Sequence, residues 1–178
     1  MIELHPGVAL VLNLLMWPCW SIAVGYWGHR RPLDDLAGER WWSRLRGFEA
    51  DGSCYARFSH IKRWKDLMPE AGGFFTGGFA KRFVCRDPNH LSRFVIETRR
   101  SEWVHWVIML AWPVSAVWNP PWAVGVMLLY ALAANLPCIV IQRYNRARLL
   151  RALQRGPATQ PADVVLPRGD AVLVLPHV

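Results

Sequence analysis

Several signatures of common site chemistries are missing from these 178 residues. The four cysteines form no C-x-x-C pair. Pairing Cys54 with His60, or Cys85 with His90, fits no common zinc spacing, so free thiols are expected and no metal site. The glycine pairs within 72–79 lack the fixed spacing and the terminal Lys-Ser/Thr of a phosphate-binding loop, and they indicate a flexible turn instead. No serine or cysteine is evidently activated, which favours direct group transfer over a covalent enzyme intermediate.

Charged side chains are absent from three apolar stretches, each predicted to be a transmembrane helix. The first is long enough to cross a hydrocarbon core of roughly 30 Å. No basic residue precedes it and Glu3 does, so we expect a retained helix, kinked at Pro18, rather than a signal peptide. The three stretches are 7–27, 103–118 and 122–141.

What the chain has instead is tryptophan and positive charge. It contains 11 tryptophans, and its 21 Lys/Arg against 13 Asp/Glu give a net charge of +8. The basic residues flank the apolar stretches, so anionic headgroups explain them better than nucleic acid does. The distribution places the region 28–102 and the C-terminus in the cytoplasm and the N-terminus outside. We therefore expect an all-α integral membrane protein with one domain, 1–155, and a loosely ordered tail, 156–178.

The region 28–102 is predicted to lie along the cytoplasmic interface. Asp34 and Asp35 are N-cap candidates for an amphipathic interfacial helix over 36–48. His29 and Asp34 also form the H-x-x-x-x-D string found in many glycerolipid acyltransferases. Six histidines in a basic chain make a chance match easy, so this string is the weaker hypothesis.

The stretch 97–106 joins the charged region to the second apolar stretch on one expected helix. At 100° per residue, Thr98, Ser101, Glu102 and His105 share a face. A carboxylate one turn from an imidazole can orient it as a general base. The alternative is an ordinary helix start held at the headgroups by tryptophans and arginines.

A second polar face is expected on the third apolar stretch, where Asn135, Cys138, Gln142 and Arg146 align. A buried amide in a membrane helix is a functional candidate. The alternative is a hydrogen bond between helices that contributes about 1 kcal/mol.

Three ordered motifs resemble one family. They are Arg63-Trp64-Lys65, the run Glu97-Thr98-x-Arg100-x-Glu102-x-x-His105-Trp106, and Asn135-x-Pro137-x-x-x-Gln142-Arg143-Tyr144-Asn145-Arg146-x-Arg148. Over roughly residues 8–150 the chain is similar to the glycosyl-4,4'-diaponeurosporenoate acyltransferases, small bacterial membrane proteins linked to the last step of staphyloxanthin-type carotenoid synthesis. The loop 72–79 and the tail after about 155 depart from that pattern.

The resemblance implies transfer of a fatty acyl group from a thioester, on coenzyme A or a carrier protein, to a sugar hydroxyl of a glycosylated carotenoid or similar glycolipid. It implies no tightly bound cofactor and a site in the bacterial cell membrane. His105 is the expected base, Glu102 its orienting group, and Asn135 or a nearby arginine the oxyanion donor, with Glu97 beside them. Expected substrate-binding residues are Arg100, Trp64, Lys65, Trp106, Gln142, Arg143, Asn145, Arg146 and Arg148. Two rival interpretations are a non-catalytic lipid-binding or scaffold protein and a small membrane methyltransferase.

Overall fold

The computed structural model describes residues 2–49, 52–68 and 87–155, and this part of the chain is mostly helical and contains no strand. The elements in chain order are α1 (Pro6–Arg30), α2 (Asp34–Ala37), η1 (Gly47–Glu49), α3 (Ser53–Phe58), α4 (Ile61–Trp64), η2 (Lys65–Leu67), α5 (Pro88–Met109), η3 (Trp112–Val117) and α6 (Pro121–Gln154). The prediction of an all-helical chain is confirmed for the described ranges. The loop 72–79 and the tail 156–178 lie outside them.

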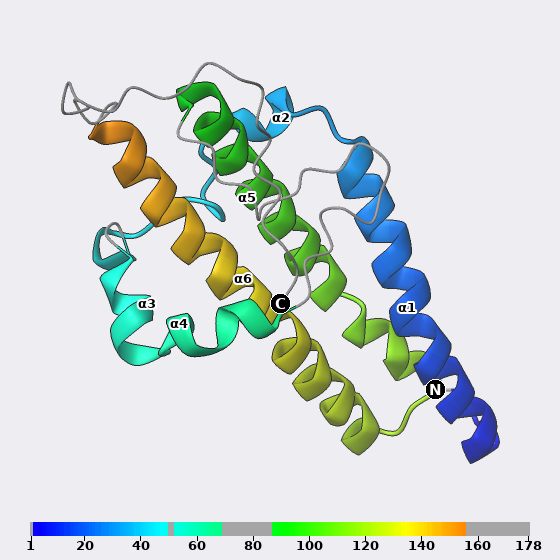
Figure 1. Ribbon diagram of the computed structural model, residues 1–178. Coiled ribbons are helices and arrows are strands. Elements are labelled where there is room, and N and C mark those ends of the chain that lie inside the picture. The colour runs from blue at the N-terminus through cyan, green and yellow to red at the C-terminus, as the bar shows by residue number, and fades with distance from the viewer. Residues whose placement is uncertain (1, 50–51, 69–86, 156–178) are drawn as a thin grey trace, which may run out of the picture.

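Three long helices form the body of the molecule, with α5 between α1 and α6 (Figure 1). Helices α1 and α6 run in the same direction, and α5 with η3 returns the chain in the opposite direction (Figure 1). One end of this bundle holds the N-terminus and the start of α6. The other end holds α2, the first turns of α5 and the last turns of α6. The charged residues are therefore gathered at one end of the bundle.

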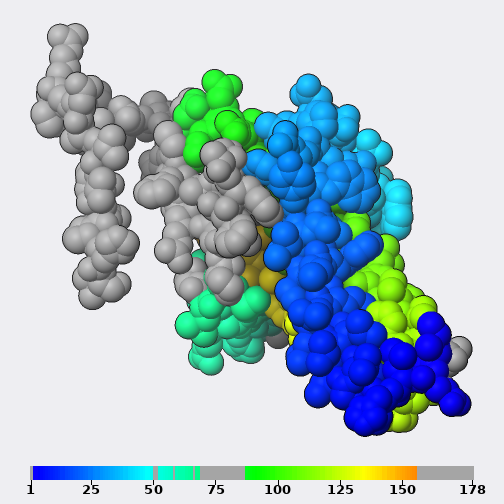
Figure 2. Space-filling model, turned by 90° about the vertical axis from the view of Figure 1, so that its right-hand side faces the viewer, coloured from blue at the N-terminus to red at the C-terminus, as the bar shows by residue number. Residues whose placement is uncertain are grey.

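Two helices, not three, are long and apolar enough to cross a membrane: α1 and α6. Only 11% and 17% of their apolar windows are buried, whereas the core helix of a soluble protein would be mostly buried. Helix α1 exposes its apolar side chains along one face of the molecule (Figure 2). The predicted span at 103–118 is wrong, because α5 carries five charged residues between Arg93 and Glu102 and its uncharged part ends at Met109, after which the chain continues as the short 3-10 helix η3.

The predicted interfacial helix over 36–48 is also wrong. Asp34 and Asp35 lie inside the first turn of a four-residue helix whose N-cap is Leu33, and Gly38 is extended. Beyond Gly38 the backbone makes only a single turn at 41–43, closed by bonds from the amides of Ser43 and Arg44 to the carbonyl of Arg40, and the carbonyls of Trp42 and Arg44 accept from a side chain of α6. Tertiary contacts thus override the amphipathic pattern of this segment.

Close packing joins α1 to α5 near the charged end. A Cβ atom on Gly28 would lie 2.4 Å from Cγ2 of Val104, so only glycine permits this approach. The rings of Trp27 and Trp103 meet edge to face at 4.9 Å, and the guanidinium of Arg31 lies 4.5 Å from the Trp103 ring. Tryptophan with arginine at one level of a bundle is typical of a membrane interface.

A polar cluster closes the opposite, apolar end. Asn13 of α1 and Asn119 exchange amide hydrogen bonds of 3.0 and 2.8 Å, and Trp118 Nε1 donates to Asn13 Oδ1 at 2.9 Å. The same asparagine of α1 therefore holds the turn before α6 in place.

Candidate functional site

Buried polar residues line the contact between α5 and α6, on the charged half of the bundle. Helix α5 begins at the N-cap Asp87 with Pro88 in its first turn, as the sequence predicts. Its buried polar side chains are Glu97, Thr98, Arg99 and Glu102, and those of α6 are Asn135, Gln142 and Arg146. The two polar faces expected from spacing thus lie against each other in the fold. Ser101, Cys138 and His105 are partly buried at the margins of these faces.

Glu102 is the centre of the site. Its side chain is fully buried, and it bridges two arginines of α6. Arg143 donates to Oε1 at 2.7 Å, and Arg146 donates to Oε2 at 2.5 Å. Trp106, one turn further along α5, donates its indole N–H to Oε1 at 3.4 Å. Charge-assisted bonds of this length are among the strongest that proteins make, so this carboxylate is held in one orientation.

A second buried carboxylate, Glu49 of η1, binds the far side of Arg143. The Nε and Nη2 atoms of Arg143 donate to Oε1 and Oε2 of Glu49 at 2.8 and 2.6 Å. Tyr55 and the backbone amide of Arg46 also donate to this carboxylate. Burial alone would raise the pKa of Glu49, but the hydrogen bonds from Arg143, Tyr55 and Arg46 outweigh it and hold the pKa at about 2. Glu49 is therefore ionised at neutral pH.

We call Glu49, Glu102, Arg143 and Arg146 the buried quartet. It joins three segments that are far apart in sequence. Arg143 also donates to the carbonyls of Trp42 and Arg44 at 3.1 and 2.9 Å, which fixes the extended segment before η1. Sequence reasoning missed Glu49 and Tyr55, because the arginine that Glu49 binds is 94 residues away in the sequence and Tyr55 is recruited through Glu49. Their only signal is the requirement that a buried arginine have an acidic partner.

The quartet lies beside further positive charge. Arg99 on α5 donates to the carbonyls of Leu36 and Ala37 in α2, and its nearest carboxylate, on the half-exposed Glu39, is 3.7 Å away. Burial, and then repulsion from Arg146, lower the pKa of Arg99. The Nε and Nη1 atoms of Arg146 are buried without a hydrogen-bond partner within the described part of the chain. These N–H groups of Arg146 can therefore donate to an additional acceptor, such as a bound anion.

His105 contacts α6 one turn below Glu102. Its Nδ1 lies 3.0 Å from Oδ1 of Asn135. The amide nitrogen of Asn135 donates to the carbonyl of Ala131 at 2.9 Å, and this bond places Oδ1 toward the imidazole. Because Oδ1 can only accept, Nδ1 carries the proton in the neutral ring and Nε2 has the lone pair.

This geometry revises two expected roles. The carboxylate of Glu102 is engaged by Arg143 and Arg146, while Asn135 makes the hydrogen bond that orients the ring of His105. The amide nitrogen of Asn135 is bonded to Ala131, so its oxygen, and not its N–H, faces the imidazole.

Two other predicted residues form a separate pair. Glu97 accepts two bonds from Arg100 at 3.1 and 3.2 Å, and Arg100 also donates to the carbonyl of Arg31 at the end of α1. Both side chains are buried or nearly so, which makes this pair a connection between α1 and α5.

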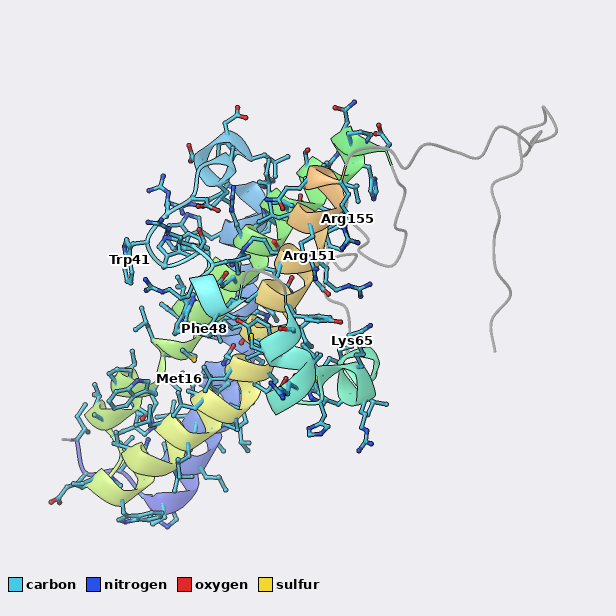
Figure 3. The ribbon with its side chains drawn as sticks, turned by 90° about the vertical axis from the view of Figure 1, so that its left-hand side faces the viewer. Met16, Trp41, Phe48, Lys65, Arg151 and Arg155 are labelled. Atoms are coloured by element: carbon cyan, nitrogen blue, oxygen red, sulfur yellow. The ribbon has the colours of Figure 1, made fainter. Side chains whose placement is uncertain are left out.

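The remaining predicted binding residues are spread over the surface around the quartet. Trp64 donates to the carbonyl of Ser59 at 2.7 Å, and Lys65 and Asn145 are partly buried. Trp106 is 37% exposed. Arg148 is exposed and its guanidinium lies 5.6 Å from the Tyr144 ring. Lys65 lies on the side of the molecule opposite Trp41 (Figure 3). The structure therefore separates the predicted arginines, with Arg143 and Arg146 paired inside and Arg148 outside.

No group of three or more His, Cys, Asp or Glu side chains is arranged as a metal site among the residues that the structure covers. Cys54, Cys19 and Cys138 are free thiols, and Cys85 is outside the described ranges.

Comparison with known proteins gives a consistent result. The family model described as glycosyl-4,4'-diaponeurosporenoate acyltransferase matches residues 38–155, which include every member of the quartet as well as His105 and Asn135. Curated proteins of that name from Staphylococcus aureus strains USA300 and NCTC 8325 are 29% identical over 109 residues. These alignments cover 60% of this chain and 65% of each relative, so the match spans less than two thirds of the relatives' length. No solved structure matches the chain.

Proposed function

The chain belongs to the glycosyl-4,4'-diaponeurosporenoate acyltransferase family, and we propose that it is a membrane O-acyltransferase. The proposed reaction joins a fatty acyl group to a sugar hydroxyl of a glycosylated carotenoid or a similar glycolipid. The observation that carries the proposal is the imidazole of His105, oriented by Asn135 within the matched region. The buried quartet, whose Glu102 lies one turn from His105 on α5, also contains Arg146, whose Nε and Nη1 have no partner in the described part of the chain, and this supports chemistry in which negative charge develops.

The proposed step is direct transfer. Nε2 of His105 removes the proton of the acceptor hydroxyl as its oxygen attacks the thioester carbonyl. The new C–O bond forms, the C–S bond breaks, and the departing thiolate takes up a proton from the imidazolium. Asn135 keeps the ring in the tautomer that this step requires. The buried Nε and Nη1 of Arg146, which have no partner in the described part of the chain, are the proposed donors to the tetrahedral oxyanion.

We place the substrates from exposure and position. Trp106 is partly exposed beside His105 and Glu102, which suits stacking against the acceptor sugar, and Gln142 lies two turns from Asn135 on the same face of α6. Trp64, Lys65 and Asn145 stay as predicted substrate-binding residues. The donor is a diffusible thioester.

In this proposal, the apolar halves of α1 and α6 anchor the protein in the membrane. The exposure of their apolar side chains and the Trp27–Trp103–Arg31 contacts at the charged end support this placement. The excess of arginine at that end favours a cytoplasmic location for it, which leaves the N-terminus outside. The acceptor's tail then lies in the bilayer, and its sugar reaches the level of His105.

A direct assay tests the function. The full chain, reconstituted in lipid, is incubated with a glycosylated carotenoid or a simpler glycolipid and with acyl-coenzyme A or acyl-carrier protein. We expect a less polar product, heavier by one acyl group, from which mild alkali removes that group. A methyltransferase would add only a methyl group. Binding of the acceptor without transfer from either donor would support the lipid-binding alternative and contradict the proposal.

The base is tested with matched histidine variants. His105→Ala should lose at least about 100-fold in rate, since general bases contribute about 100- to 10,000-fold. His29→Ala, at the last turn of α1, is the control and should retain activity. A large loss of activity in His29→Ala, together with normal activity in His105→Ala, would indicate that the catalytic base belongs to the H-x-x-x-x-D string instead.

A further inference from the structure

The arginines of α6 and its cap fall into two sets that face different ways. Arg143 and Arg146 point inward to Glu49 and Glu102. Arg148, Arg151 and Arg155 are exposed, and at 100° per residue they lie within about 60° of one another on the helix. We call these three the outer stripe. No Asp or Glu occurs anywhere in α6, so the helix itself supplies no counter-charge to the stripe.

In the proposed membrane placement, two of the three arginines of the stripe lie beyond the headgroups. The apolar sequence ends at Ile141, and a helix rises 1.5 Å per residue, which puts Arg151 and Arg155 about 15 and 21 Å beyond it. The headgroup region on each side of a bilayer is only about 5–8 Å thick. Arg151 and Arg155 lie in succession at the end of α6, on the side of the molecule away from Trp41 (Figure 3). In the proposed placement Arg151 and Arg155 therefore extend into water, where a soluble partner can bind them.

The shape of the stripe distinguishes between the two classes of acyl donor. A nucleotide such as coenzyme A is normally held in a concave pocket. The outer stripe is a row of side chains about 10 Å long on the convex surface of a helix, from the rise between Arg148 and Arg155. Such a row suits an acidic helix of another protein, whose carboxylates can meet several guanidiniums at once.

We propose that the outer stripe docks an acidic acyl-carrier protein, which delivers the fatty acyl thioester to the site. This assignment rests on the proposed acyltransferase function and specifies its donor. Asn135 lies about 20 Å below Arg148 along α6, so the acyl group is carried from the docking surface to His105 on the carrier's long phosphopantetheine arm.

Binding and transfer are measured on the full chain in lipid nanodiscs, with a long-chain acyl-carrier protein and the matching acyl-coenzyme A as probes. The test variant combines Arg148→Gln, Arg151→Gln and Arg155→Gln. The control combines Arg40→Gln, Arg57→Gln and Lys62→Gln, which removes the same charge from exposed positions outside α6. The test variant should bind the carrier protein about 10-fold more weakly, as expected for the loss of three exposed ion pairs. The control should bind it normally, and added salt should weaken wild-type binding.

Three results would overturn the assignment. The first is that the wild type does not bind the carrier protein. If the wild type still transfers the acyl group from acyl-coenzyme A, the acyltransferase function stands and only the docking assignment fails. The second is equal weakening by both triple variants, which would indicate net charge rather than a docking site. The third is an unchanged affinity of the test variant for the carrier protein with reduced binding to anionic vesicles, which would assign the stripe to lipid.

Discussion

Removing the charge of Glu102 should lower the stability of the fold by more than most single substitutions do. In Glu102→Gln, Arg143 keeps its two bonds to Glu49, but Arg146 loses its carboxylate and stays almost completely buried. Breaking one side of a buried ion pair costs about 3–5 kcal/mol. For a chain of this size each kcal/mol lowers the melting temperature by about 2–4 °C, so we expect a decrease of about 6–20 °C.

The assay is thermal unfolding of the detergent-solubilised protein, and a compensating variant tests the cause. Glu102→Gln combined with Arg146→Met removes the unpaired cation together with its lost partner, and should recover at least about 1 kcal/mol relative to the single variant. Glu39→Gln is the control, because that carboxylate is half exposed and 3.7 Å from Arg99. It should cost less than about 1 kcal/mol. A melting temperature of Glu102→Gln within about 2 °C of the wild type would refute the argument that the quartet holds the fold.

Four further outcomes are expected. The pKa of Glu49 is depressed from 4.5 to about 2, so its stabilisation should be complete above pH 5 and lost as the pH falls toward 2, in acid-unfolding curves that Glu49→Gln flattens. Asn135→Ala should lower the acyl-transfer rate by about 10-fold or more without a comparable loss of stability; an unchanged rate would separate Asn135 from the imidazole. Gly28→Val should disrupt the α1–α5 contact at Val104 and lower the melting temperature by several degrees, whereas Gly125→Val meets no atom within 4 Å and should not. Cys54 should resist membrane-impermeant thiol reagents in intact cells and react after permeabilisation; labelling in intact cells would reverse the proposed orientation.

The parts of the fold that were predictable are those with a local cause. Asp87-Pro88 marks the start of α5, and the uncharged run after Gly7 makes α1. The spacing of Asn135, Gln142 and Arg146 predicts a buried face, and the structure places it against α5. These features follow from helical periodicity and capping, which act within a few residues of one another.

The features that were not predictable depend on contacts between distant segments. The amphipathic pattern at 36–48 favours a helix, but the chain makes only a turn at 41–43, and the carbonyls of Trp42 and Arg44 bind Arg143 instead of the next helical turn. In the sequence, Glu49 cannot be distinguished from an ordinary surface carboxylate, because its partner Arg143 lies on α6. The pairing of His105 with Asn135 was likewise hidden, since helical spacing assigned the imidazole to its neighbour Glu102 and could not show which residue of α6 would lie opposite.

The order in which the ribosome makes the chain gives the buried quartet one more consequence. Glu49 and Glu102 are synthesised before Arg143 and Arg146, so both carboxylates wait without their cations until most of α6 has emerged. Burying them unpaired would be costly, so residues 40–49 take their native position only after α6 has formed. The buried site can therefore form only after α6 has been synthesised. A chain truncated before Arg143 would lack this site and would be susceptible to the proteases that remove incomplete proteins.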